Sequence, residues 1–237
     1  MEIRGASALV TGAGRGIGRA VALALARAGA YVTAVSRTAV ELDSLVAEIE
    51  GEGGRARAHP GDLCDPQICA GAVEAAAHHG RLRILVNNAG IGGFTPLADT
   101  TDEEWDRILG TNLTAAFRVT REALPQLSDG GGHVFMISSL AGSNAIANMS
   151  AYCASKAALD HLARCLMLEV RHQGVKVTTI APGSVDTAFA GMPRDGGSDW
   201  MLRPEDVATT ILELLRTRDE AHLSRVEMRP SSPKKRA

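Results

Sequence analysis

The sequence is poor in aromatic residues, which make up 3% of its 237 positions. Proteins that bind single-stranded nucleic acid stack the bases on aromatic side chains, so the scarcity of rings argues against that class. Charge of one sign is lacking too, because the formal net charge is -2. A chain with this balance has no general attraction to nucleic acid or to acidic membrane surfaces. We therefore expect neither a nucleic-acid partner nor a membrane partner.

Cysteine is also scarce, and its spacing matches no metal or disulfide pattern. The four cysteines are Cys64, Cys69, Cys153 and Cys165. No two of them form Cys-x-x-Cys and no histidine cluster completes a zinc pattern, so no metal site is expected. In a chain of this length we interpret them as reduced thiols of a cytoplasmic protein. Cys153 follows Tyr152 directly and is interpreted as its neighbour, not as a nucleophile.

Long hydrophobic runs are missing as well. No stretch of 18 apolar residues exists to span a membrane. The first residues lead straight into a predicted strand and a glycine turn, so no signal peptide is expected. Hydrophobic residues nevertheless make up 45% of the chain. This content and length predict one globular domain over residues 1–237, with a core large enough to fold unaided.

Short apolar runs alternate with longer helical patterns along the whole chain. Strands are predicted at 7–11, 31–35, 55–59, 84–86, 133–138, 175–180 and 226–228. Helices are predicted at 16–28, 39–51, 67–79, 102–124, 151–173 and 204–215. This alternation predicts an α/β fold, a single doubly wound parallel sheet of the Rossmann type with helices on both faces. Residues 187–203 are predicted to form a mobile loop near the substrate, and 230–237 a polar tail.

A glycine-rich turn, Thr-Gly-Ala-Gly-Arg-Gly-Ile-Gly from Thr11 to Gly18, follows the first predicted strand. Its glycines permit a tight turn and a close approach of the backbone to a pyrophosphate. The helix that follows would present its N-terminal amides to the negative charge. The position between a strand and a helix therefore predicts a dinucleotide site.

The end of the second strand bears on which dinucleotide binds. An acidic residue there would bind the ribose 2′-hydroxyl of NAD. This chain has Ser36 and Arg37 instead, and Arg15 in the glycine turn adds a second guanidinium. Guanidinium groups suit phosphate through their fork of donors. We favour NADP over NAD. The alternative is that both arginines are merely exposed and that the protein is an NAD-linked secondary alcohol dehydrogenase.

Tyr152 and Lys156 lie four residues apart in a predicted helix and would share one face of it. Tyrosine transfers protons poorly at neutral pH because its ordinary pKa is about 10, but a nearby ammonium stabilises the phenolate. Ser139 could hold a carbonyl oxygen beside them, whereas Ser138 is expected to face the other way. The pair alone occurs often by chance, so its meaning depends on the rest of the chain.

With these segments in view, the chain resembles the short-chain dehydrogenase/reductase family over residues 6–215. The motifs occur in the order that the family has, namely TGAGRGIG from Thr11, Asp62-Leu63, Asn87-Asn88-Ala89-Gly90, Asn112, Ser139, Tyr152-x-x-x-Lys156 and Pro182-Gly183. The resemblance implies reversible hydride transfer between NADP(H) and a carbonyl or secondary alcohol substrate. A dinucleotide-binding regulator without turnover is the alternative from another class.

The resemblance also implies a role for each site residue. Tyr152 would be the general acid/base, and Lys156 would lower its pKa and bond the nicotinamide ribose. Ser139 would orient the substrate oxygen, and Asn112 would hold a water that links Lys156 to solvent. The cofactor would lie among Gly12, Arg15, Gly16, Ile17, Gly18, Ser36, Arg37, Asp62, Leu63, Asn88, Ala89, Gly90, Tyr152, Lys156, Pro182, Gly183, Val185 and Thr187.

The identity of the substrate depends on segments without a motif, at 92–95, 141–148 and after Thr187. The family resemblance admits 3-oxoacyl thioesters, steroids, sugars and simple ketones. Many family members that reduce 3-oxoacyl chains end in a Val-Asp-Gly-Gly-like strand and turn, whereas this chain has Val-Glu-Met-Arg-Pro at 226–230. The difference weakens the acyl-carrier interpretation and leaves the usual tetramer contact open. We expect a homodimer or a homotetramer.

Overall fold

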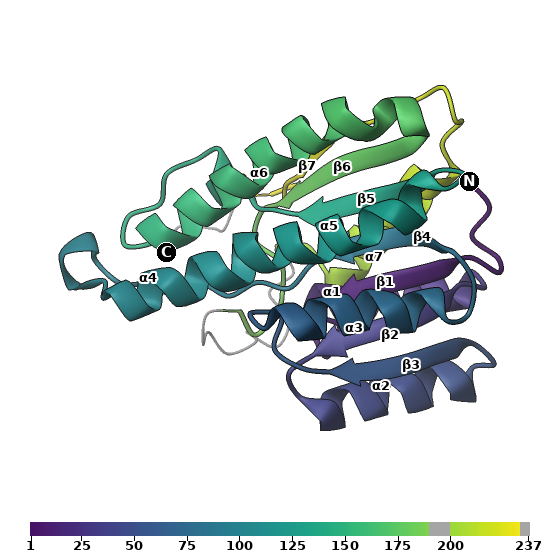
Figure 1. Ribbon diagram of the computed structural model, residues 1–237. Coiled ribbons are helices and arrows are strands. Elements are labelled where there is room, and N and C mark those ends of the chain that lie inside the picture. The colour runs from purple at the N-terminus through teal and green to yellow at the C-terminus, as the bar shows by residue number, and fades with distance from the viewer. Residues whose placement is uncertain (190–199, 233–237) are drawn as a thin grey trace.

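A computed structural model describes the chain over residues 1–189 and 200–232. Seven parallel strands form one sheet in the order β3-β2-β1-β4-β5-β6-β7 (Figure 1). The strands are β1 (Ser7–Thr11), β2 (Tyr31–Ser36), β3 (Arg55–Pro60), β4 (Leu82–Asn87), β5 (Gly132–Ile137), β6 (Val175–Pro182) and β7 (Arg225–Met228). The strand order changes direction between β1 and β4, which is where sheets of this kind bind ligands, at the carboxyl ends of the strands.

Helices cover both faces of the sheet, as predicted. They are α1 (Gly16–Arg27), α2 (Ala39–Gly51), α3 (Pro66–Ala77), α4 (Asp102–Leu109), α5 (Ala115–Ser128), α6 (Ser150–Val170) and α7 (Pro204–Arg216). Helices α1, α2 and α7 share one hydrophobic cluster, and α3, α5 and α6 share another on the opposite face. In Figure 1 the second group lies side by side in front of the sheet. The predicted doubly wound α/β fold is therefore confirmed.

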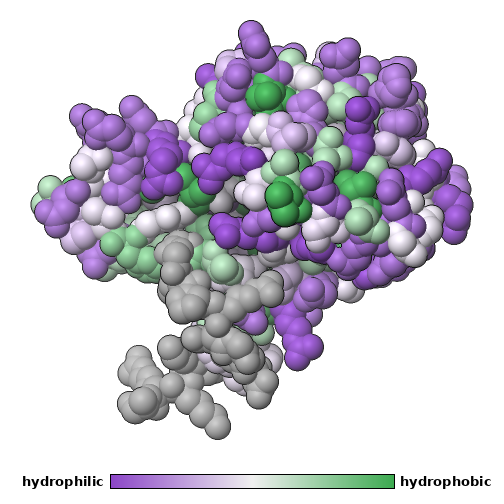
Figure 2. Space-filling model, turned by 90° about the horizontal axis from the view of Figure 1, so that it is seen from below, coloured by the Kyte–Doolittle hydropathy of each residue, from purple (hydrophilic) through white to green (hydrophobic). Residues whose placement is uncertain are grey.

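The core consists of aliphatic side chains, as the shortage of aromatic residues requires. All residues of β1 and β5 are buried, which is typical of parallel strands covered on both faces. Phe135 on β5 is the largest fully buried side chain. The face shown in Figure 2 is mainly hydrophilic, with hydrophobic side chains scattered over it. No helix in the described part of the chain is long and apolar enough to cross a membrane.

The helical segment predicted over 102–124 runs unbroken over 102–128, but it contains a π turn that was not predicted. Helix α4 ends at Leu109, a π-helical turn occupies Gly110–Thr114, and α5 follows. The π turn adds a residue to the helical repeat, and such turns occur often at functional sites. Asn112 lies within it and is buried. Residue periodicity cannot reveal this turn, because the segment keeps a helical pattern on both sides.

The loop predicted at 187–203 is fastened at its base. Val185 and Leu202 form an isolated parallel bridge. The Asp186 amide donates to the Leu202 carbonyl at 2.8 Å, and the Leu202 amide donates to the Ser184 carbonyl at 3.0 Å. Residues 190–199 of this loop and 233–237 of the predicted tail lie outside the described residues, so their predicted mobility stays a prediction.

Candidate active site

The glycine turn lies at the carboxyl end of β1 and leads into α1. Gly12 and Gly16 have φ values of +63° and +56°, which residues with a side chain rarely adopt. Arg15 precedes α1 and makes no side-chain cap, so the first amides of the helix remain available to an anion. A helix N-terminus of this form suits the pyrophosphate of a dinucleotide.

Asn88 joins this turn to the end of β4. Its Nδ2 donates to the carbonyls of Thr11 at 3.0 Å and Gly12 at 3.1 Å. The Thr11 hydroxyl in turn accepts from the amides of Asn88 at 2.9 Å and Ala89 at 3.0 Å. A Cβ at Gly18 would lie 2.5 Å from the Asn88 amide nitrogen and closer still to the Gly12 carbonyl. Asn88 and Gly18 therefore shape the cradle, and the residues present fit a bound dinucleotide.

The predicted site for the adenosine 2′-phosphate lies between β2 and the glycine turn. Ser36 ends β2, and Arg37 and Arg15 are exposed beside it. A carboxylate that the sequence analysis missed also lies here. The Glu41 side chain covers Gly14, and a Cβ at Gly14 would contact its Oε2 and would lie 3.0 Å from the Ser36 hydroxyl. The signal was an acidic residue in the first turn of α2, which points back toward the end of β2.

Asp62 and Leu63 are predicted to border the adenine, and they differ in which of their atoms are exposed to it. The Asp62 carboxylate accepts from the Cys64 amide at 2.9 Å and fixes the turn after β3. The Leu63 side chain is buried in the hydrophobic cluster with α3 and α5. Of these two residues, the exposed Asp62 and the backbone of Leu63 are thus what an adenine could contact.

Lys156 is buried on α6 and its ammonium faces the end of β5. Its Nζ donates to the Ile137 carbonyl at 2.8 Å and lies 5.9 Å from the centroid of the Tyr152 ring. Burial lowers the pKa of Lys156 to about 8, and the Asp160 carboxylate opposes this by raising it. The group is therefore mostly protonated at neutral pH and releases its proton more easily than an exposed lysine.

Tyr152 lies in the first turn of α6 and is 8% exposed. Burial raises the pKa of its phenol, and the Ser139 hydroxyl beside it lowers that pKa in part. The group is therefore a protonated phenol at neutral pH. The Ser139 hydroxyl also accepts from the Ala141 amide at 3.1 Å, whereas Ser138 turns inward and donates to the Lys156 carbonyl at 3.3 Å. The opposite orientations predicted for the two serines are confirmed.

Asn112 holds the chain that follows β4. Its Nδ2 donates to the Ile91 carbonyl and to the Ser155 hydroxyl, both at 2.9 Å, and its Oδ1 accepts from the Ile91 amide at 2.8 Å. A Cβ at Gly90 would lie 3.4 Å from the Lys156 ammonium and 3.5 Å from Asn112 Oδ1. The structure thus brings Asn112 and Lys156 to the same point. The water predicted beside Asn112 stays a prediction.

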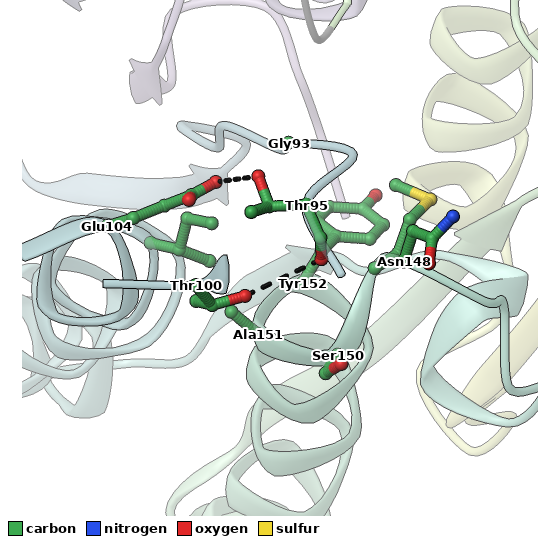
Figure 3. A pocket seen from close by; sticks show the side chains of 10 residues that line it. Gly93, Thr95, Thr100, Glu104, Asn148, Ser150, Ala151 and Tyr152 are labelled. Carbon is green, nitrogen blue, oxygen red and sulfur yellow. Dashed lines mark hydrogen bonds between the residues drawn. The ribbon is translucent and has the colours of Figure 1, made fainter. Parts of the chain in front are cut away.

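A small cavity lies next to Tyr152, between α4 and the start of α6 (Figure 3). Its volume is about 10 Å³, which is about the room of one water molecule. Glu104 from α4 points toward Thr95 in Figure 3 and accepts its hydroxyl hydrogen bond at 2.9 Å. Asn148 on the other side has a φ of +63°. No motif in the sequence pointed to Glu104, which lines this cavity together with Tyr152.

The segment after β6 crosses from the glycine turn to Tyr152. A Cβ at Gly16 would lie 3.1 Å from the Thr187 methyl group. The Phe189 ring lies with its centroid 5.3 Å from that of Tyr152. Gly92 leaves room for it, since a Cβ there would lie 2.7 Å from the Phe189 ring. Phe189 belongs to no motif in the sequence, and only its position two residues after Thr187 could have suggested it.

The predicted residues at the end of β6 lie at the same edge of the sheet. Pro182 is the last residue of β6 and is buried. The Gly183 amide donates to the Met228 carbonyl at 2.8 Å, which fixes its position against β7. Val185 is held by the bridge to Leu202. These residues therefore lie at the carboxyl end of β6, on the same edge of the sheet as the glycine turn.

Comparison with known proteins agrees with this geometry. A family model described as short chain dehydrogenase matches residues 6–196. Sepiapterin reductase of Chlorobaculum tepidum is 32% identical over 233 residues, covering 94% of this chain and 96% of that protein. D-erythrulose reductase of Gallus gallus is 39% identical over 189 residues, covering 79% of this chain and 74% of that protein. The chain therefore belongs to the short-chain dehydrogenase/reductase family and to its oxidoreductases.

Solved structures show the same relationship. A metagenomic short-chain oxidoreductase in complex with NADP superposes with a TM-score of 0.86 at 35% identity, covering 98% of this chain and all of the other. A short-chain dehydrogenase from Burkholderia cenocepacia in complex with NADP gives a TM-score of 0.90 at 32% identity, covering 97% and 98%. NADP is named as bound to those two proteins. Both superpositions cover nearly the whole of this chain, so they include the sheet and the site.

Proposed function

We propose that this protein is an NADPH-dependent reductase of ketones or aldehydes that also runs the reverse oxidation of secondary alcohols. The observation that supports this most is the convergence of a buried ammonium, a phenol and a hydroxyl at the sheet edge that carries the glycine turn. Lys156 and Tyr152 lie on α6, with the ammonium 5.9 Å from the centroid of the phenol ring, and Ser139, which follows β5, has its hydroxyl beside that phenol. A binding module would not need a buried lysine, because burying its charge is costly.

The choice of NADP rests on charge. Arg15 and Arg37 flank the end of β2, and neither forms an ion pair in the described part of the chain. Their guanidinium groups would pair with a 2′-phosphate. Two structural neighbours carry NADP in their names, which supports the same choice. Glu41 acts against it, because its carboxylate covers Gly14 next to the Ser36 hydroxyl and would lie near a 2′-phosphate bound there.

The protein's own groups would position the carbonyl and supply its proton. The bound cofactor supplies a hydride from nicotinamide C4. Ser139 donates a hydrogen bond to the substrate oxygen and fixes the carbonyl carbon in place. Tyr152 protonates that oxygen as negative charge develops on it, and Lys156 stabilises the phenolate that remains. Asn112 holds the backbone at Ile91 and so keeps the chain beneath the site rigid.

The replacement Tyr152→Phe tests this function. The variant should keep its affinity for NADPH and lose turnover by a factor of about 10² to 10⁴, the usual contribution of a positioned acid. Oxidation of NADPH with a panel of ketones and aldehydes, followed at saturating cofactor, measures it. Tyr31→Phe is the matched control, because Tyr31 is the other tyrosine of the chain and stacks on His79 away from the site. Turnover of Tyr152→Phe close to wild type would contradict the assignment.

Two rival functions are separated by the same preparations. Dissociation constants for NADPH and NADH decide between the NADP-linked reductase and an NAD-linked alcohol dehydrogenase. Tight NADPH binding with no turnover of any carbonyl compound would favour the dinucleotide-binding regulator.

We also propose that the protein is a homo-oligomer that pairs through α5 and α6. Phe117 on α5 is 43% exposed and Leu168 on α6 is 58% exposed, although both are large hydrophobic side chains. Their burial in a second copy would remove this apolar surface from water.

A further inference from the structure

The last strand, β7, and the residue that follows it carry a row of charges, Arg225, Glu227 and Arg229. Glu227 accepts from Arg225 at 3.2 Å and from Arg229 at 2.9 Å. The Arg229 side chain is largely exposed, whereas Arg225 is only 26% exposed and extends inward. Arg225 on β7 and Arg229 just after it therefore have different surroundings and serve as test and control.

Arg225 extends from β7 to the helix that carries the proposed catalytic pair. Its Nη1 lies 2.6 Å from Asp160 Oδ2. Asp160 is 3% exposed, and its Oδ1 is buried without a hydrogen-bond partner in the described residues. A carboxylate in such a place is costly, and a well-packed apolar pair is often as stable or more so. The arrangement is therefore not explained by stability alone.

The same guanidinium also holds the loop that follows Ser139. Its Nη2 donates to the Ser143 hydroxyl at 2.8 Å. Gly142 lies directly on α6, because a Cβ there would be 2.9 Å from Asp160 Oδ2 and 3.1 Å from the Lys156 carbonyl. One side chain from the C-terminal strand thus clamps the loop after the serine against the helix of the lysine.

We infer that Arg225 and Asp160 are a positioning pair for the proposed reduction. Arg225 holds the loop after Ser139 against α6, and Asp160 keeps a negative charge one helical turn from Lys156. This inference rests on the proposed function. It assigns a purpose to the charges of β7, namely to set the distance between the serine hydroxyl and the phenol and to keep the lysine protonated.

The electrostatic part follows from the charges around Lys156. The titratable groups near it are Tyr152 and Asp160 on α6, with Arg225 and Glu227 behind Asp160 on β7. From β5 it meets a backbone carbonyl. Because Asp160 is the anion that raises the pKa of Lys156, loss of its charge leaves the lowering effect of burial unopposed. The ammonium would then lose its proton at a lower pH.

Kinetics of the full-length protein, with NADPH and the best carbonyl compound of the panel, test the pair. In Asp160→Asn the alkaline limb of the kcat profile should move about one pH unit lower, the effect of one charge a helical turn away. Near pH 8 this corresponds to a loss of about fivefold in kcat. Arg225→Met should lower kcat without weakening the binding of NADPH, and Arg225→Lys should restore part of the lost kcat. Arg229→Met is the matched control and should leave kcat and its pH profile unchanged.

A purely structural role for the pair would give a different result. If Asp160→Asn and Arg225→Met lower the melting temperature but keep the wild-type pH profile and kcat, the pair is structural and the inference is wrong. Should the Asp160 variant not fold, Ser143→Ala removes an exposed hydroxyl only, and unchanged kcat in that variant overturns the clamp. Failure of the wild type to turn over any carbonyl compound would instead refute the proposed function.

Discussion

Replacing Lys156 by methionine should make the protein more stable at neutral pH while it removes activity. Lysine has an ordinary pKa of 10.5, and burial brings that of Lys156 to about 8. Each pKa unit corresponds to about 1.4 kcal/mol, so keeping this ammonium charged in the folded protein costs about 3 kcal/mol. Methionine has a similar length and no charge, and it fits irregular space well. The variant does not bear this cost.

Part of this gain in the free energy of unfolding is offset by a lost hydrogen bond. The Ile137 carbonyl loses the hydrogen bond from the ammonium, and an unsatisfied buried acceptor costs about 1–3 kcal/mol. We therefore expect Lys156→Met to gain about 1 kcal/mol at neutral pH. In a chain of this size that corresponds to about 2–4 °C in melting temperature. NADPH-dependent turnover should fall to background, because the phenolate of Tyr152 loses its cation.

The pH dependence identifies the cause. Between about pH 8 and 10.5 the unfolded chain holds a proton on Lys156 that the folded protein has released. Wild-type stability therefore rises by about 3 kcal/mol relative to the variant across this window, so the gap of about 1 kcal/mol closes and then reverses. The cost is fully present below pH 8. A loss of stability in the variant at neutral pH, or a gap that stays constant up to about pH 10, would refute the reasoning.

Urea unfolding followed by circular dichroism, repeated across this pH range, gives the free energy of unfolding for both proteins. Arg164→Met is the matched control, since Arg164 is exposed on the same helix. Its replacement removes one positive charge from the surface and should change stability by less than about 0.5 kcal/mol at any pH in the series.

Three further predictions concern the cofactor, the proton and assembly. Glu41→Gln should tighten NADPH binding by about tenfold at low salt and leave NADH binding nearly unchanged, because the substitution removes a carboxylate near the 2′-phosphate. Fluorescence titration measures both affinities, and Glu50→Gln on the same helix is the control. Equal effects on the two cofactors would exclude this mechanism. Since burial raises the pKa of Tyr152, carbonyl reduction should slow and alcohol oxidation should quicken as pH rises, and identical pH profiles in the two directions would contradict this. Leu168→Glu should convert the oligomer to a smaller species in light scattering, and an unchanged mass would rule out pairing through α6.

The sequence predicted the layered sheet well because apolar runs and helical patterns alternate without interruption. It also predicted the opposite directions of Ser138 and Ser139, since neighbours in the extended backbone that follows β5 face opposite sides. It failed at the π turn, where Asn112 sits, because one added residue hardly changes a helical pattern. Glu41, Glu104 and Phe189 were missed for another reason. Each comes from an element whose own residues carry no motif, and three-dimensional packing alone brings it to the site.

The Thr11 hydroxyl, which bonds two amides at the end of β4, has a consequence for how the protein is made. Its partners Asn88 and Ala89 lie 77 and 78 residues further along the chain. The ribosome adds residues at about 5–20 per second, so several seconds separate their synthesis. The glycine turn therefore cannot reach its final shape on the emerging chain before β4 has left the exit tunnel. We expect a nascent chain stopped before β4 to bind no dinucleotide, although it already contains every glycine of the turn.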